Sequence, residues 1–315
     1  MKNSISFIKY PHYELLSYMG TGEGSGAKLY EAQAIGAPPG SPQVCLKTID
    51  QSLDDTLEQG SLDLTSITRN PVTRLQKEIY WAIRLVGVPG IPRICDWGNS
   101  LNDDPQTNQK RGYAAFEYKV GTNLTTLQRQ DSYHELPPQL VFSIAEQVAD
   151  ILDGMHARNV LHGDIKPSNL LWDDTSQSVS LVDLELAREL HNRNKKLKDP
   201  DPNSNIACGT PSLMAPEQAK PDEKNIGVQT DFFNLGATLY TLLSGCFPYE
   251  GRTILERVLK AENSNRYPFQ GVIRYNYPLE IINFIEKLMN SNPKKRHASA
   301  AEVKSDIQNI RQQLP

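Results

Sequence analysis

The order of apolar and polar positions divides the chain into a strand-rich first third and a helix-rich remainder. Short segments that alternate loosely or run apolar predict strands, and apolar residues that recur every three or four positions predict helices. This division favours an α+β architecture with two lobes and a cleft between them. Strands are predicted over 13–19, 28–34, 44–49, 91–97 and 113–118. Helices are predicted after Pro71 and over 140–156, 231–243, 255–261, 279–289 and 300–311.

The segment between the third strand and the first helix is acidic. Residues 50–68 contain no lysine or arginine. Their acids lack the regular spacing of a calcium-binding loop, so we expect an exposed, mobile insertion and not a metal site. The acids are Asp50, Asp54, Asp55, Glu58 and Asp63.

Length and composition narrow the class of protein. The 315 residues would form about two compact units, or two lobes of one domain. The net charge of −4 argues against a nucleic-acid-binding protein that relies on broad phosphate neutralisation. The four cysteines lie far apart, which argues against a zinc site or a disulfide framework. No signal peptide or membrane-spanning run is evident, so we expect a cytoplasmic protein that binds neither nucleic acid nor membrane.

A glycine-rich segment lies between the first two predicted strands. Gly20, Gly22, Gly24 and Gly26 alternate with other residues. Clustered glycines let backbone N–H groups approach a phosphate closely, but a glycine-rich hairpin can also be purely structural. A strand follows where a dinucleotide fingerprint would have a helix, and the Walker-type pattern is absent. Both remaining interpretations stay open.

Lys47 ends the third predicted strand, in the sequence Val44-Cys-Leu-Lys47. A lysine among apolar residues needs an acidic partner or an anionic ligand if it is buried. Glu78, on the first predicted helix, is a candidate partner. In isolation, an exposed strand lysine is the simpler interpretation.

The most specific segment is His162-Gly-Asp-Ile-Lys-Pro-Ser-Asn169, in a loop after a long predicted helix. Asp164 can accept a proton, Lys166 can neutralise a phosphate, and Asn169 can ligate a hard metal ion. Asp183 follows an apolar strand-like segment and supplies a second acid suited to Mg²⁺.

Together these segments resemble those of the eukaryotic-type Ser/Thr protein kinase family, over nearly all of residues 13–312. Phe116-Glu117-Tyr118 resembles the hinge, and Cys208-Gly-Thr210-Pro the substrate-docking end of the activation segment. Asp231 resembles the acid on the helix beneath the catalytic loop. Arg296 resembles the arginine that, in the family, pairs with a glutamate, and Glu217 lies at the position of that glutamate. The matching motifs are 22–29, 44–47, 162–169, 183–185 and 215–217.

The resemblance implies a bilobal kinase fold with ATP in the cleft and a protein serine or threonine as acceptor. It implies that Lys47, held by Glu78, positions the phosphates. Asp164 would activate the acceptor hydroxyl and Lys166 would neutralise the γ-phosphate. The metal ion, Mg²⁺ or Mn²⁺, would be held by Asn169 and Asp183. The remaining ATP contacts would come from Gly22, Gly24, Leu29, Cys45, Glu117, Tyr118 and Leu171.

Three positions depart from the family pattern. Ala27 replaces the third loop glycine, a small change. Gly163 replaces the arginine that normally grips a phosphorylated activation loop, which predicts activity without that phosphorylation. Glu185 replaces the glycine of D-F-G, where a side chain disfavours positive φ and adds an acid near the metal. We therefore expect a segment biased toward one conformation, with altered metal affinity.

Two other functions remain open. A pseudokinase would bind nucleotide or act as a scaffold without transfer. A small-molecule kinase is the other, since His-Gly-Asp also opens the catalytic loop of aminoglycoside and choline kinase relatives. For the leading function we expect one kinase domain over 1–315, with an N-lobe over 1–118 and a C-lobe over 119–315. The basic residues Arg188, Arg193, Lys195, Lys196 and Lys198 would form either a solvated loop or a docking site for an acidic group.

Overall fold

A computed structural model describes most of the chain as two compact units. The first unit spans Met1–Leu64, Thr68–Gly87 and Ile91–Lys119, and the second spans Thr65–Ile67, Val88–Gly90 and Val120–Pro315. In the part of the chain that the structure describes, no helix is long and apolar enough to cross a membrane. The described residues are 12–22, 26–38, 40–60, 62, 70–100, 110–132, 134–190, 210–219, 226–263 and 277–314.

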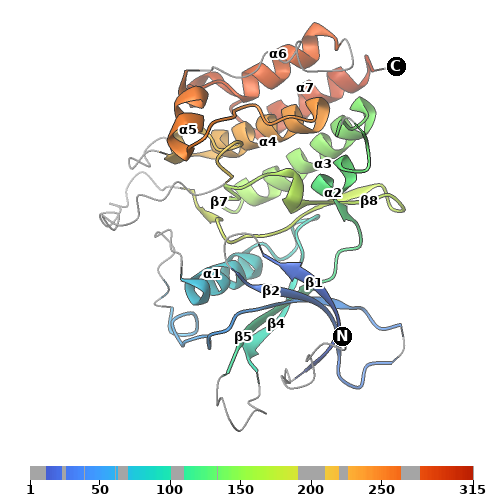
Figure 1. Cartoon of the computed structure of the whole chain (residues 1–315), viewed down its shortest axis with the longest axis vertical. Helices are drawn as coiled ribbons and strands as arrows, with labels where there is room; N and C mark the ends of the chain where they lie inside the picture. Colours follow the sequence, from blue (N-terminus) through green and yellow to red (C-terminus); the bar gives the residue numbers. More distant parts are fainter. Residues whose placement is uncertain are drawn as a thin grey trace. The chain divides into compact units, whose positions relative to one another are not determined.

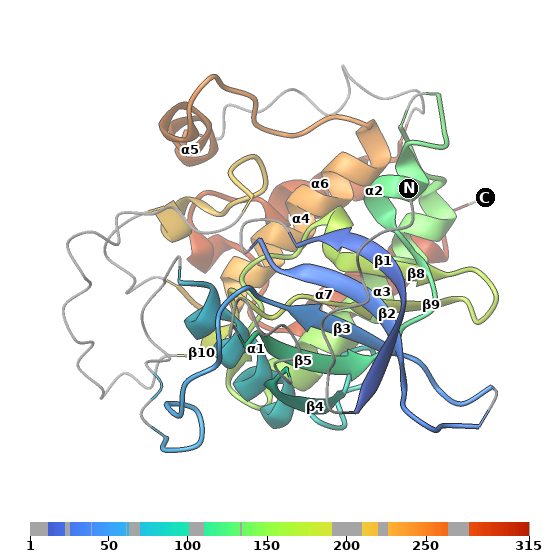
Figure 2. The same ribbon diagram turned by 60° about the horizontal axis from the view of Figure 1, so that its bottom comes forward.

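The first unit is an antiparallel five-stranded sheet with one helix, α1 (Pro71–Arg84). Figure 2 shows the strands in their spatial order, β1-β2-β3-β5-β4. The helix starts at Pro71 because the Asn70 side chain accepts a hydrogen bond from the Val72 N–H at 2.9 Å. The strands are β1 (Tyr13–Thr21), β2 (Lys28–Ala34), β3 (Val44–Thr48), β4 (Ile94–Asn99) and β5 (Gly112–Glu117).

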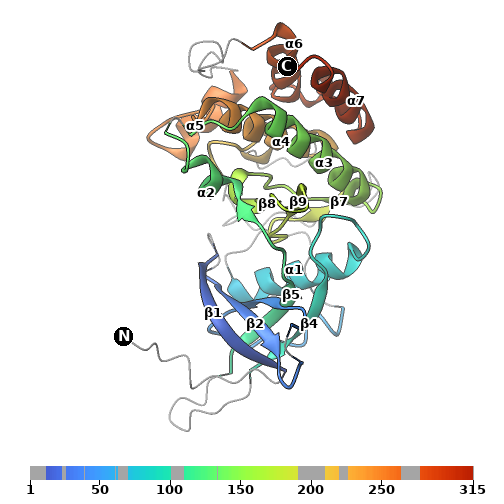
Figure 3. The ribbon, with the colours of Figure 1, turned by 90° about the vertical axis from the view of Figure 1, so that its right-hand side faces the viewer.

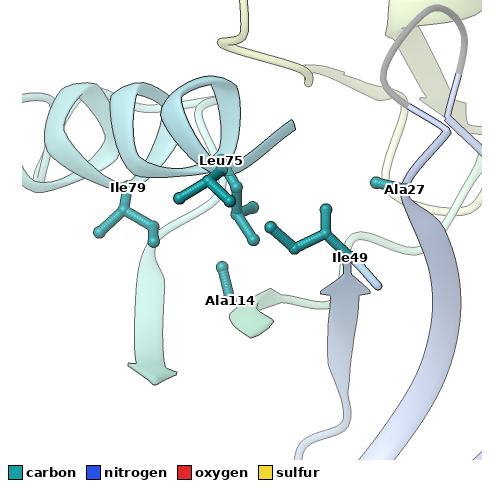
Figure 4. Close-up of a cluster of buried hydrophobic side chains, with 6 residues drawn as sticks. Ala27, Ile49, Leu75, Ile79 and Ala114 are labelled. Atoms are coloured by element: carbon teal, nitrogen blue, oxygen red, sulfur yellow. The ribbon is translucent and has the colours of Figure 1, made fainter. Parts of the chain in front are cut away.

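The two faces of this sheet bury different side chains, as the period of two along a strand requires. One face carries Ala32, Val44, Leu46, Tyr113 and Ala115. The other is covered by α1, and Figure 4 shows Leu75 and Ile79 pointing from the helix toward Ala114 and Ile49. Burying each large aliphatic side chain stabilises the unit by about 1.5–3 kcal/mol, so this packing fixes α1 on the sheet.

The described part of the acidic segment is in contact with α1, and its mobility stays a prediction. The buried Gln76 side chain donates to the Asp54 carbonyl oxygen at 2.8 Å and to Asp54 Oδ1 at 2.7 Å. Leu53 and Leu57 pack against the apolar cluster under α1. As expected, the described acidic residues of the segment are exposed. They are Asp50, Asp54, Asp55 and Glu58. Asp63 lies outside the described residues.

Gln76→Ala is expected to lower the free energy of unfolding by about 0.5–1.5 kcal/mol, because the hydrogen bonds from Gln76 to the exposed Asp54 are lost. Hydrogen bonds from Thr56 and Gln76 hold the pKa of Asp54 below its ordinary value. The contribution of these hydrogen bonds to the free energy of unfolding is therefore present at neutral pH. It is lost as the pH falls through the lowered pKa of Asp54. Urea unfolding at neutral and acidic pH measures both effects. Gln59→Ala, at an exposed position of the same segment, is the control. Equal losses in the two variants would contradict the anchoring role.

The second unit is mainly helical (Figure 1). It also contains two small sheets, with the strand orders β6-β8-β9 and β10-β7. Its strands are β6 (Thr122–Asn123), β7 (Val160–Leu161), β8 (Leu170–Asp173), β9 (Ser178–Leu181) and β10 (Arg188–Glu189). Its α-helices are α2 (Leu124–Gln128), α3 (Pro138–His156), α4 (Val228–Ser244), α5 (Ile254–Glu262), α6 (Leu279–Leu288) and α7 (Ala300–Arg311). Its short 3₁₀ turns are η2 (Pro167–Asn169), η3 (Pro216–Ala219) and η6 (Pro293–Lys295).

Helix α4 is the centre of the second unit, because almost every one of its residues is buried. Helix α7 packs against α3 (Figure 3), and Lys304 on α7 pairs with Asp150 on α3 at 2.6 Å. The α+β prediction is confirmed, and the predicted helices differ from the observed ones by a few residues at their ends. Strand β4 begins at Ile94 and not at Ile91, since Pro92 has no N–H to donate to the ladder.

Candidate active site

Lys47 and Glu78 form a buried ion pair in the first unit. Lys47 Nζ lies 2.7 Å from Glu78 Oε2, and each residue is 5% exposed. Strand β3 supplies the lysine, and α1, fixed by its apolar face, supplies the glutamate. The predicted partner is thus observed, and the simpler interpretation of an exposed strand lysine is wrong. A buried ammonium group stays charged at low energetic cost only beside such a partner.

Three predicted ATP contacts share a face of the sheet. Leu29 is paired in register with Lys47, and Cys45 is two residues before Lys47 on the same strand. Directly opposed and i, i+2 positions point to the same side, which α1 covers. Cys45 is half-buried, and burial raises the pKa of its thiol to about 11, which disfavours the thiolate form at neutral pH. Leu171 belongs to β8 of the second unit and is half-buried there.

The glycine-rich segment forms the turn between β1 and β2. The Gly22 N–H donates to the Ala27 carbonyl oxygen at 2.7 Å, which closes the loop. Ala27 is fully buried in the cluster beneath α1, so its methyl group contributes to packing. Gly24 lies outside the described residues, and both interpretations of the loop remain open.

The segment predicted as a hinge begins at the end of β5. The Glu117 N–H donates to the Arg93 carbonyl oxygen at 2.8 Å. The Tyr118 N–H donates to the Gln43 carbonyl oxygen at 3.4 Å. Both N–H groups therefore serve the first unit itself. Within the described residues, the N–H of Lys119 has no partner. Lys119 was not among the hinge residues predicted from the sequence. It becomes a candidate because β5 ends at Glu117, two residues before it.

In the second unit, Asp164 is held between a cation and a hydroxyl-bearing segment. Asp164 Oδ2 lies 2.9 Å from Lys166 Nζ. Asp164 Oδ1 accepts the Thr210 N–H at 3.1 Å, and the Thr210 hydroxyl lies 3.5 Å away. Asp164 is 8% exposed and Lys166 is 7% exposed. Both oxygens of the Asp164 carboxylate are therefore held in place by neighbouring groups.

Asp231, at the start of α4, holds the loop before Asp164. It is fully buried and accepts the N–H groups of His162 at 3.1 Å and Gly163 at 2.8 Å. His156 Nε2 lies 2.8 Å from the same carboxyl group. Burial acts to raise the pKa of Asp231, but the hydrogen bond and charge of His156 outweigh it and lower the pKa. The carboxylate therefore stays ionised while it holds two consecutive peptide N–H groups.

Asn169 and Asp183 are the candidate metal ligands. Asn169 Nδ2 donates to the Asp164 carbonyl oxygen at 2.9 Å, which leaves the amide oxygen directed elsewhere. The Val182 N–H donates to the Asn169 carbonyl oxygen at 2.9 Å, so the residue before Asp183 lies beside Asn169. Amide and carboxylate oxygens are the donors that Mg²⁺ and Mn²⁺ prefer. The donor set in this unit therefore fits a hard divalent cation.

Glu217 and Arg296 form a second buried ion pair, as expected from the sequence. Arg296 Nη1 and Nη2 contact the two oxygens of Glu217 at 2.5 and 2.9 Å. Thr230 donates to Glu217 Oε1 at 2.9 Å, and the guanidinium carbon lies 4.8 Å from the centre of the Phe233 ring. These contacts fix η3, which follows Thr210 in the chain.

The protein kinase domain family matches residues 13–307 of this chain. The chain belongs to the protein kinase domain family. It is 26% identical to a probable serine/threonine-protein kinase of Clostridium perfringens, CPE1738. The aligned 240 residues cover 76% of this chain and 32% of that kinase. It is 31% identical over 234 residues to the serine/threonine-protein kinase PknD of Mycobacterium tuberculosis, covering 73% of this chain and 32% of PknD. The chain spans about a third or less of the length of the curated relatives it matches first.

One departure from the kinase pattern has a different conformation from the one expected. Glu185 does not have a positive φ, whereas Asp183 has a φ of 70°. Aspartate tolerates this region better than most residues, so the side chain at 185 creates no backbone strain. Leu184 is buried, as expected for the residue in place of the phenylalanine. The effect of Glu185 on metal affinity stays a prediction.

Part of the kinase activation segment lies outside the described residues. This part includes Cys208 and the basic residues Arg193, Lys195, Lys196 and Lys198. Arg188, the first residue of the basic run, pairs in register with Leu161 in the β10-β7 sheet. The choice between a solvated loop and a docking site therefore stays a prediction.

Proposed function

We propose that this chain transfers the γ-phosphate of ATP to a serine or threonine hydroxyl of a protein. The arrangement that carries the proposal is Asp164, with Lys166 at one carboxylate oxygen and Thr210 at the other. Asp164 would accept the proton of the acceptor hydroxyl as its oxygen attacks phosphorus, and Lys166 would neutralise the charge on the transferred group. Such transfer depends mainly on positioning and on electrostatic stabilisation.

Lys47, oriented by Glu78, would bind the α- and β-phosphates. Asn169 and Asp183 would hold Mg²⁺ or Mn²⁺, which neutralises phosphate charge when bound. Leu29, Cys45 and Leu171 would contact the adenine, and the glycine-rich loop with Gly22 and Gly24 would cover the phosphates.

At the hinge, we assign the adenine contacts to the backbone of Glu117 and Lys119. The Tyr118 N–H is directed to Gln43, which makes it a poor donor to a ligand. In this proposal, the acceptor-binding and catalytic segments are held in place by four residues, Thr210, Glu217, Asp231 and Arg296. Residues 1–118 and 119–315 act as the two lobes of one cytoplasmic kinase domain.

The proposal is tested with radiolabelled ATP, Mg²⁺, a mixture of basic and acidic protein acceptors, and aminoglycoside and choline acceptors. We expect label on serine or threonine of protein, identified by phosphoamino-acid analysis and mass spectrometry. Label only on a small acceptor would instead assign a small-molecule kinase. Nucleotide binding without any transfer would assign a pseudokinase.

We also expect activity without phosphorylation of the activation segment, because Gly163 offers no side chain to grip a phosphate. Protein treated with phosphatase, and verified as unphosphorylated by mass spectrometry, should show an initial rate within about two-fold of untreated protein. A lag that disappears after preincubation with ATP would contradict this expectation.

A further inference from the structure

Gln218 connects three separate segments of the second unit through one side-chain amide. It follows Glu217 in η3 and is 6% exposed. Its Nε2 donates to the Gly163 carbonyl oxygen at 2.8 Å. Its Oε1 accepts the Ala215 N–H at 2.9 Å and Asn234 Nδ2 at 2.9 Å. The catalytic loop, the segment after Thr210 and helix α4 therefore meet at this residue.

Asn234 extends the same network. It lies on α4, is 2% exposed, and donates through Nδ2 to the Leu213 carbonyl oxygen at 3.0 Å as well as to Gln218. Its amide thus holds a second backbone group of the segment that contains Ala215. Since buried amides are costly to leave unsatisfied, these bonds favour one arrangement of that segment against α4.

The contact with Gly163 acts on the peptide group that precedes Asp164. The carbonyl oxygen of this peptide accepts from Gln218, and its N–H, which belongs to Asp164, lies 3.3 Å from His162 Nδ1. Gly163 has a φ of 76° and no Cβ, so its backbone has more conformational freedom than that of other residues. Fixing both ends of this peptide group restricts its rotation, and with it the direction of the Asp164 side chain.

We propose that Gln218 is a positioning residue, which orients Asp164 through the Gly163 carbonyl group and couples that orientation to the segment 213–215. The inference rests on the proposed transfer activity. Gln218 contacts neither nucleotide nor acceptor in this proposal and acts through the peptide group alone. Uncharged hydrogen bonds then connect the catalytic loop with the end of the activation segment in a chain that lacks the arginine before Asp164.

The test uses Gln218→Glu, which keeps the shape and both acceptor contacts of the side chain but removes the donor to Gly163. Because a carboxylate oxygen would then face the Gly163 carbonyl oxygen, we expect kcat to fall about ten-fold or more. The KM for ATP should stay within about two-fold, because Lys47 and Glu78 are untouched. A merely structural role would instead lower the melting temperature and leave kcat of the folded fraction unchanged.

Gln128→Glu is the matched control. Gln128 is also 6% exposed, and its amide donates to the carbonyl oxygens of His134 at 2.7 Å and Thr241 at 2.9 Å, neither of which belongs to the catalytic loop. This variant loses the same kind of buried donor and should keep the wild-type kcat. Gln218→Met, which removes all three hydrogen bonds without adding charge, should lower kcat and also raise the KM for the protein acceptor.

The outcomes separate the inference from the proposed function. Two results with an active wild type would overturn the role of Gln218 alone. One is a kcat of Gln218→Glu within two-fold of the wild-type kcat, and the other is an equal loss of kcat in Gln128→Glu. Absence of transfer by the wild type overturns the proposed function and the inference together. If Gln218→Glu does not fold, the kcat of Gln218→Met decides by the same limits.

Discussion

Asp164→Asn is expected to lower kcat by about 10²- to 10⁴-fold, the range that a positioned general base contributes. Asparagine has nearly the shape of aspartate but does not accept the proton of the acceptor hydroxyl. It also leaves the Lys166 ammonium group, 2.9 Å from Asp164 Oδ2, without its negative partner oxygen. The KM for ATP should change little, since Lys47 and the residues proposed to contact the adenine are unchanged. Steady-state kinetics with a protein acceptor measure both quantities.

Asp173→Asn is the control for this variant. Asp173 ends β8, and it accepts the Thr175 N–H at 2.9 Å and the Ser176 hydroxyl at 2.7 Å within a turn. The same chemical change there should leave kcat unaltered. If Asp164→Asn kept more than a tenth of the wild-type kcat, Asp164 would not be the base. Equal and negligible transfer by wild type and variant would support the pseudokinase.

Arg296→Met is expected to lower the free energy of unfolding by about 3–5 kcal/mol, because it leaves the Glu217 carboxylate buried without its charged partner. The Arg296 side chain is 0% exposed and that of Glu217 is 4% exposed. The guanidinium group also donates to the carbonyl oxygens of Gln229 at 2.9 Å and Asn290 at 2.7 Å. Urea unfolding followed by circular dichroism measures the loss.

Arg311→Met is the matched control for the ion pair. Arg311 pairs with Glu146, but its side chain is 42% exposed, and surface pairs contribute only about 0–1 kcal/mol. The double variant Glu217→Gln/Arg296→Met should be more stable than Arg296→Met alone, since it no longer buries an unpaired charge. A loss in Arg296→Met no larger than that in Arg311→Met would contradict the structural role of the pair.

The sequence named Glu78 as a candidate partner of Lys47, and the buried ion pair between them is observed. The roles of Asp164 and Asn169 stay predictions, which rest on residue types specific to the chemistry and on a spacing restricted by the mechanism. Helices such as α3 were predictable because their apolar residues repeat at the helical period. In each case a local pattern carries the information.

The amides could not be predicted in the same way. Gln76 and Gln218 satisfy groups that are 22 and 55 residues away in the sequence. A glutamine side chain carries no local signal of which distant backbone group it will meet. The contact between the acidic segment and α1 did leave a trace, since Leu53 and Leu57 interrupt its polar residues, but the acids dominated the interpretation. The sequence pattern likewise did not indicate that the positive φ falls on Asp183 and not on residue 185.

The network around Gln218 also has a consequence for the conditions under which the domain would work. Amide groups do not titrate between acid and alkaline pH, and hydrogen bonds between neutral groups are not weakened by counterions as exposed ion pairs are. The connection between Gln218, Asn234 and Gly163 should therefore persist at high ionic strength, where salt weakens the exposed pair Lys304–Asp150.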